Sequence, residues 1–288
     1  MNNSQYSPSS FSILPPVVKN LLIINFLFFV ATIAFKSFYN IDLKEVLGLH
    51  YYESGQFHPY QILSYMFMHG DFTHLFFNMF ALWMFGSAIE NFWGWKRFLV
   101  YYLITGIGAA VTHYAVVHFQ IAPDLRLLDA CIQDPNLANV SSLTTQHRFV
   151  LDKYSGEIWS NFQTFQYNCQ LLIGGNNGAA VQGNINAFLV EYREYYLGLP
   201  NVIGASGSVF GILLAFGMMF PNVMIYLYFL FPIKAKWFVI LYGALELYAG
   251  IRGTNDGIAH FAHLGGMLFG IILILLWRKS GKNSYEYY

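Results

Sequence analysis

Long apolar stretches separated by short polar ones run through most of this chain. A helix needs about 20 mainly apolar residues to cross a bilayer, and six stretches approach that length. They cover residues 18–38, 61–91, 97–118, 204–221, 236–251 and 258–277. An aromatic-rich stretch between the fourth and fifth is expected to lie at the membrane interface. The pattern predicts an all-α membrane protein with six transmembrane helices.

The connection between the third and fourth spans is different in kind. It is polar and rich in Asn, Gln and Gly, and connections of this length are usually functional or disordered. We interpret it as a long insertion on the outer side of the membrane. The expected organisation is an N-terminal tail (1–17), three spans (18–118), the insertion (119–203), three spans (204–278) and a C-terminal tail (279–288).

Composition supports a membrane protein and excludes some partners. The chain is 56% hydrophobic and 10% charged, whereas a soluble domain is about 25% charged. The formal net charge is zero, so nothing indicates binding to nucleic acid. The N-terminal tail lacks the basic start and the small-residue cleavage site of a signal peptide.

Charge placement predicts the orientation. Cations close to the span ends favour the cytoplasmic side. With the N-terminus inside, this side receives Lys19, Lys96, Arg97, Lys234, Lys236, Arg278, Lys279 and Lys282. The outer side receives Asp42, Glu45, Glu53 and the insertion. We therefore expect a multi-pass protein of a bacterial inner (plasma) membrane, with both termini in the cytoplasm.

Three polar residues inside apolar spans are the main functional signal. Ionisable residues are costly within a bilayer, so such residues indicate a functional site. At 1.5 Å per residue, His74, Ser206 and His263 each lie roughly 21–24 Å from the predicted inner end of their spans. In a hydrocarbon core about 30 Å thick, all three then lie on the order of 8 Å below the outer face.

Small residues predict which spans touch. They recur every four residues as Gly207, Gly211 and Ala215 on the fourth span and as Ala262, Gly266 and Gly270 on the sixth. Such stripes let two helix backbones approach closely. Each stripe begins one residue from a candidate catalytic group, so close packing brings Ser206 and His263 towards hydrogen-bonding distance. Glycine stripes are also ordinary membrane packing, and the agreement in depth and phase favours the functional interpretation.

These residues suit hydrolysis by a serine nucleophile. A serine hydroxyl needs a base to take its proton, and His263 is the candidate base for Ser206. Donors for an oxyanion are His74, Asn78 and the backbone N–H of Ser206 at a helix start. Spans two, four and six contain no convincing carboxylate as a third member. Glu246 in span five is the nearest rival for that role, and we expect it near the outer interface.

A metal site is the main chemical alternative. Four histidines could converge on zinc: His69, His74, His260 and His263. The chain has no HExxH motif and no carboxylate near these histidines in sequence, which argues against a metalloprotease. His260 lies about one turn closer to the outer surface than His263, and we expect it to be a solvated or hydrogen-bonded neighbour.

Three motifs give the chain a resemblance to rhomboid intramembrane serine proteases. Residues 74–78 match HxxxN, residues 204–207 match GxSG, and residues 262–270 match AHxxGxxxG. The last match selects His263 over His260 as the base. The resemblance implies a rhomboid-like bundle that hydrolyses peptide bonds in or near transmembrane segments of other membrane proteins, without metal or other cofactor.

The resemblance also assigns supporting roles and has two departures. His74 and Asn78 become oxyanion residues, and Gly204, Gly207 and His69 become substrate-binding residues. Where the family often has Trp-Arg in the first outer loop, residues 60–61 are Tyr-Gln, and the insertion at residues 119–203 replaces a short loop. The alternative function is a non-catalytic rhomboid-like binding protein, against which the retained serine and histidine argue.

The two cysteines fit no metal-ligand spacing. The expected topology places Cys131 and Cys169 outside the membrane, where disulfides persist. We predict that they pair and close a loop of roughly 40 residues, worth about 4 kcal/mol in the chain-entropy model.

Overall fold

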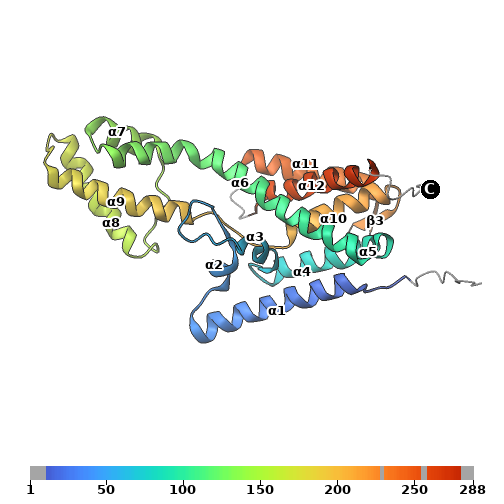
Figure 1. The fold of residues 1–288 in the computed structure, drawn as a ribbon. Coiled ribbons are helices and arrows are strands. Elements are labelled where there is room, and N and C mark those ends of the chain that lie inside the picture. The colour runs from blue at the N-terminus through green and yellow to red at the C-terminus, as the bar shows by residue number, and fades with distance from the viewer. Residues whose placement is uncertain (1–10, 228–229, 254–257, 280–288) are drawn as a thin grey trace, which may run out of the picture. The chain divides into compact units, whose positions relative to one another are not determined.

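The computed structural model describes residues 11–227, 230–253 and 258–279 of a mostly helical chain. Contacts divide the chain into two compact units. The first unit comprises residues 1–49, 59–113 and 202–288, and the second comprises residues 50–58 and 114–201. Figure 1 shows the helices of both.

The first unit contains the apolar helices. Its helical elements are α1 (Pro16–Tyr39), α2 (Leu43–Leu47), α3 (Gln61–Ser64), η1 (Tyr65–Phe67), α4 (Phe72–Ala81), η2 (Leu82–Gly86), α5 (Ser87–Trp93), the first part of α6 (Trp95–Gln133), α10 (Ser206–Met219), α11 (Ala235–Arg252) and α12 (His260–Lys279). Among the described residues, four helices are long and apolar enough to cross a membrane: α1, the continuous run Phe72–Trp93, α6 and α12. The apolar helix α10 is shorter. Six spans remain a prediction.

The first helix begins where the sequence predicts and is held at its start by another helix. Pro16 occupies the first helical position, where a missing N–H costs nothing. The buried carboxylate of Glu90 on α5 accepts hydrogen bonds from the backbone N–H groups of Val17 (2.9 Å) and Val18 (2.8 Å). These bonds satisfy two of the otherwise unpaired donors of α1. The start of α1 therefore lies beside the end of α5.

The second predicted span begins later than expected. We predicted one helix over residues 61–91, but α4 begins at Phe72, and His69 lies in the turn before it. The side chain of Asp71 accepts a hydrogen bond from the backbone N–H of His74 at 2.9 Å and so caps the new helix start. His69 and His74 therefore do not share a helix, which corrects the prediction.

Helices α6, α10 and α12 pack closely, of which the small residues predict the contact between α10 and α12. A Cβ atom at Gly266 would collide with the backbone carbonyl of Gly207, so only glycine allows this approach of α12 to α10. Gly211 instead faces α6, where a Cβ atom would meet the side chain of Thr105 at 2.7 Å. The Tyr101 hydroxyl on α6 donates to the carbonyl of Gly211 at 2.8 Å. The predicted contact between the fourth and sixth spans is confirmed, with α6 as a third partner.

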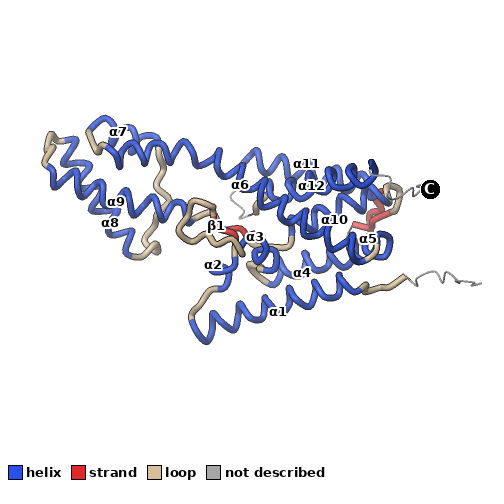
Figure 2. The backbone as a smooth tube through the Cα atoms, viewed as in Figure 1, coloured by secondary structure: helices blue, strands red, loops and turns tan. Residues whose placement is uncertain are grey.

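The chain is not purely α-helical. Strand β3 (Met224–Leu227) pairs antiparallel with β4 (Phe231–Lys234), and Met224 lies opposite Lys234. Strands β1 (Leu49–His50) and β2 (Asn201–Val202) form a second two-stranded sheet. Figure 2 draws these short strands in red. The aromatic-rich stretch expected at the membrane interface thus contributes to a hairpin, consistent with the strand preference of Ile and Tyr.

The second unit has its own core, unlike the polar segment that composition suggested. It contains the rest of α6, α7 (Leu137–Gln146), α8 (Glu157–Ile173) and α9 (Ala179–Gly198). Its buried residues recur at helical spacing, including Phe162, Phe165, Cys169 and Leu172 on α8 and Val181, Ile185, Phe188, Leu189 and Tyr192 on α9. The apolar residues are few but lie on facing helix sides, which is sufficient for a packed core.

The structure does not contain the predicted disulfide between the two cysteines. Cys131 and Cys169 are both free thiols, and both are buried in the core of the second unit. Buried free cysteines pack as small apolar side chains. Burial raises the pKa of the Cys169 thiol to about 12, which keeps it neutral and unreactive.

Thiol counting checks this arrangement. We expect protein prepared without reductant to react slowly with a polar maleimide while folded, because Cys131 is fully buried and Cys169 is 5% exposed. Two thiols per chain should react after denaturation. If the denatured protein shows none until a reductant is added, the cysteines form a disulfide and the free-thiol arrangement is wrong.

Candidate active site

Ser206 is placed at the start of a buried helix by the residues before it. Its backbone begins α10, and Gly204 two positions earlier adopts φ = 128°, a conformation that favours glycine. The N–H of Gly204 donates to the carbonyl of Tyr65 at 2.9 Å, which fixes the turn. Ser206 is partly exposed, and its position at the helix start sets it at the positive end of the helix dipole.

His263 meets Ser206, as depth and packing predict. The distance from His263 Nε2 to Ser206 Oγ is 2.8 Å. The imidazole stacks on the ring of Phe210, with ring centroids 4.2 Å apart and planes inclined by 5°. Phe210 lies four residues after Ser206 and therefore above it on the same helix face. The stacking fixes the plane in which His263 presents its Nε2 atom.

Glu246, the rival for the role of third member, lies in the same cluster. One of its oxygens, Oε2, is 2.9 Å from His263 Nδ1 and 2.7 Å from His260 Nδ1. Its side chain is only 13% exposed. The sequence held a signal for this: Glu246 is ten residues after Lys236, which separates the two by about 15 Å along a helix.

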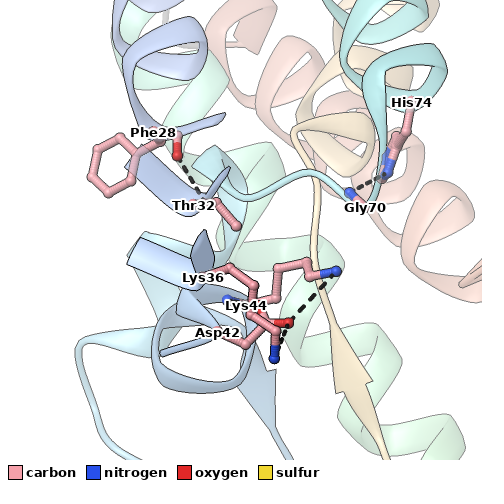
Figure 3. Close-up of polar contacts among 7 residues, drawn as sticks. All are labelled: Phe28, Thr32, Lys36, Asp42, Lys44, Gly70 and His74. Carbon is pink, nitrogen blue, oxygen red and sulfur yellow. Dashed lines mark hydrogen bonds and ion pairs between the residues drawn. The ribbon is translucent and has the colours of Figure 1, made fainter. Parts of the chain in front are cut away.

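The two oxyanion candidates lie on α4, with His74 turned towards Ser206. A Cβ atom at Gly204 would lie 2.8 Å from His74 Nε2 and 3.5 Å from Ser206 Oγ, so both side chains flank this glycine. His74 Nδ1 accepts a hydrogen bond from the N–H of Gly70 at 3.4 Å (Figure 3). A neutral imidazole then carries its proton on Nε2, the nitrogen next to Gly204. Asn78 donates one amide proton to the carbonyl of His74 at 2.9 Å and retains a second.

Two of the predicted substrate-binding residues, His69 and Gly207, make contacts with neighbouring elements. His69 is buried beside His74, with ring centroids 5.0 Å apart, and neither of its ring nitrogens has a hydrogen-bond partner among the described residues. His69 lines a pocket whose other polar residues include Lys36 and Asp42. The Nζ atom of Lys36 lies 3.9 Å from Oδ2 of Asp42 (Figure 3). Gly207 faces Ala109 of α6, so its lack of a side chain serves helix packing.

The four histidines considered for zinc do not come together as one potential metal site. Among the described residues, the side chains close enough to share an ion are Glu246, His260 and His263, with ligand atoms within 4.8 Å of one another. Two ligands of a tetrahedral zinc, each about 2.0–2.1 Å from the metal, lie roughly 3.3 Å apart. The nitrogen–oxygen distances of 2.7 and 2.9 Å are those of hydrogen bonds.

The fold and the site define a helical membrane protein that holds a serine and a histidine in contact between apolar helices. The sequence pattern of the Rhomboid domain matches residues 56–122 and 160–280, which is more than half of the chain. The chain belongs to the rhomboid family. Ser206, Glu246 and His263 all lie within the second matched segment.

One characterised relative has a similar segment. The chain is 36% identical over 55 residues to the Rhomboid protease GluP of Bacillus subtilis (strain 168). The similarity covers 19% of this chain and 11% of that protein's length. The chain therefore matches only a small part of this relative.

Proposed function

We propose that the protein is an intramembrane serine protease in which Ser206 is the nucleophile and His263 the general base. The observation that carries the proposal is the 2.8 Å contact between Ser206 Oγ and His263 Nε2 at the start of a buried helix. Family membership supports the same activity. The shared helix packing of α10 and α12 supports it further, because it holds the two side chains together without a flexible loop.

The contact suits acyl transfer in two stages. Ser206 Oγ attacks the scissile carbonyl carbon while its proton passes to His263 Nε2. The tetrahedral intermediate collapses, the C–N bond breaks, and His263 gives the proton to the leaving amine. A water molecule then attacks the acyl ester, again losing its proton to Nε2. The carboxylic acid leaves, and the proton returns to Ser206.

The developing oxyanion needs donors placed in advance. His74 Nε2 and Ser206 Oγ both flank Gly204, so the backbone N–H of Ser206 at the helix start and the Nε2–H of His74 are the first candidates. The second amide proton of Asn78 is a further candidate. These donors lie on different helices, so α4 and α10 together would form the oxyanion site.

We infer that the substrates are membrane proteins cut in or near a transmembrane segment. A helix hides its peptide bonds, so the segment must unfold locally before Ser206 can attack, and helix-breaking or small residues should favour cleavage. The proposed topology has six spans, cytoplasmic termini and residues 119–203 outside a bacterial plasma membrane. The positive residues at the span ends support this orientation.

Reconstitution tests the proposed activity. Protein purified in detergent and inserted into liposomes should cut a single-pass substrate whose transmembrane segment contains small or helix-breaking residues. Cleavage should persist in a strong chelator, because the proposed chemistry needs no metal. Binding of such substrates without cleavage would favour the non-catalytic alternative, and loss of cleavage in chelator with recovery in zinc would favour a metalloenzyme.

Asn78→Ala is expected to reduce cleavage without abolishing it. Loss of one oxyanion donor in a serine protease costs about 10²–10³ in kcat, and His74 and the serine N–H would remain here. Asn78 is 7% exposed, so thermal unfolding of the variant must be compared with wild type. Inactivation as complete as that of Ser206→Ala, in a variant of normal stability, would assign Asn78 a larger role.

A further inference from the structure

A single carboxylate oxygen joins two histidines in the cluster around Ser206. Glu246 lies on α11, and His260 and His263 lie one turn apart on α12. Both histidines direct Nδ1 at Glu246 Oε2, at 2.7 and 2.9 Å. His263 directs its other nitrogen at Ser206. A continuous chain of contacts therefore runs from the serine through the imidazole to the carboxylate.

We propose that Glu246 is a positioning residue that makes the site a Ser206–His263–Glu246 triad, whereas the sequence alone indicates a dyad. The inference rests on the proposed protease function. It assigns Glu246 two tasks: holding His263 in one tautomer and orientation, and stabilising the imidazolium that forms when Ser206 loses its proton.

The tautomer follows from what a carboxylate can do. An ionised carboxylate only accepts hydrogen bonds, so His263 must donate from Nδ1. Its Nε2 atom then carries the lone pair that receives the serine proton. Without this partner, the two tautomers compete, and one of them presents an N–H to Ser206 and cannot act as a base.

The location makes the charge effective. The side chains of Glu246 and His263 are 13% and 10% exposed, so water screens their interaction weakly. The titratable groups described around His263 are Glu246 on α11, His260 on its own helix and His74 on α4. Among these described groups Glu246 is the one that can carry a negative charge, so it is the group that stabilises the imidazolium.

His260 also contacts the carboxylate, at the same oxygen as His263. A glutamate has three rotatable side-chain bonds, and one hydrogen bond leaves much of this freedom. The contact with His260 is a second restraint on the same oxygen. His260 thus contacts the carboxylate next to the site, which agrees with its expected secondary role.

The competing explanation is that Glu246 merely ties α11 to α12. Such a tie would affect the folding of the protein and the entry of a helical substrate between the helices. It would not affect how readily Ser206 reacts with a small reagent that needs no helix movement. The reaction rate of Ser206 with a serine-directed fluorophosphonate therefore separates activation of the nucleophile from a structural tie.

The test compares Glu246→Gln, Glu246→Asp and the control Glu157→Gln in liposomes. Glu157, the first residue of α8, undergoes the same chemical change outside the cluster. We expect Glu246→Gln to lower both kcat and the fluorophosphonate rate by about 10²–10⁴-fold, the range seen for loss of a triad carboxylate or a general base. Glu246→Asp should recover part of both rates, and the control should match wild type.

Two results would overturn the triad. One is a fluorophosphonate rate in folded Glu246→Gln within about threefold of wild type. The other is inhibition of wild type by chelator with rescue by zinc, which would make the three side chains metal ligands. The first result would leave the protease proposal standing, which fails separately if Ser206→Ala still cuts substrate, whereas the second would overturn both. Thermal unfolding identifies variants that do not fold.

Discussion

Ser206→Ala is expected to abolish proteolysis and leave the protein folded. Removal of the nucleophile of a serine protease lowers kcat by about 10⁶-fold, which takes cleavage below detection. The lost side chain is one small, partly exposed hydroxyl, so the free energy of unfolding should change by about 1 kcal/mol or less. Cleavage of a transmembrane substrate in liposomes and thermal unfolding in detergent measure the two effects.

Ser208→Ala is the matched control in the same helix. Ser208 is buried and donates its hydroxyl to the carbonyl of Tyr102 at 2.7 Å, so it has a structural partner and no contact with His263. The control should cut substrate and unfold at a slightly lower temperature. Substantial cleavage by Ser206→Ala would remove Ser206 as the nucleophile, and inactivity of a folded Ser208→Ala would mean that loss of activity is not specific to Ser206.

His263→Ala is expected to be as inactive as Ser206→Ala, because no other described base contacts the serine hydroxyl. His260→Ala should retain much more activity. It removes one of the two contacts of Glu246 and leaves the contact between Glu246 and His263. His260 and His263 are each 8% exposed. The two variants should therefore lose similar packing energy and serve as controls for each other.

The comparison of the two histidines also tests the motif assignment. Substrate cleavage and the fluorophosphonate rate should fall together in His263→Ala, since both need an activated serine. If His260→Ala is the inactive variant and His263→Ala still cuts, the base has been assigned to the wrong histidine. Equal and partial losses in both would indicate that neither acts as the base.

The contact between Ser206 and His263 could be predicted because helix geometry is regular. A fixed rise per residue gives depth in the membrane, and glycine spacing gives the side on which two helices meet. These two quantities place the serine and the histidine together without knowledge of loops. The same rise per residue, counted from Lys236, could have predicted the depth of Glu246, on a helix that runs in the opposite direction.

Other features depend on interactions that periodicity does not carry. His69 lies outside the second helix because the Asp71 side chain caps a helix that begins after it. This cap is a local hydrogen bond within an otherwise apolar stretch. The core of the second unit was missed because its apolar residues are sparse and become continuous only when α8 and α9 pack. The hairpin of β3 and β4 depends on cross-strand pairing that an apolar run does not reveal.

The most direct test of the central claim is to identify the residue that a fluorophosphonate modifies. Wild-type protein in liposomes should lose substrate cleavage as one phosphonyl group is attached, and peptide mass spectrometry should locate it on Ser206. Modification should be strongly reduced in His263→Ala. An adduct on a different serine that accounts for the loss of activity, or full cleavage by protein whose Ser206 is modified, would contradict the proposed mechanism.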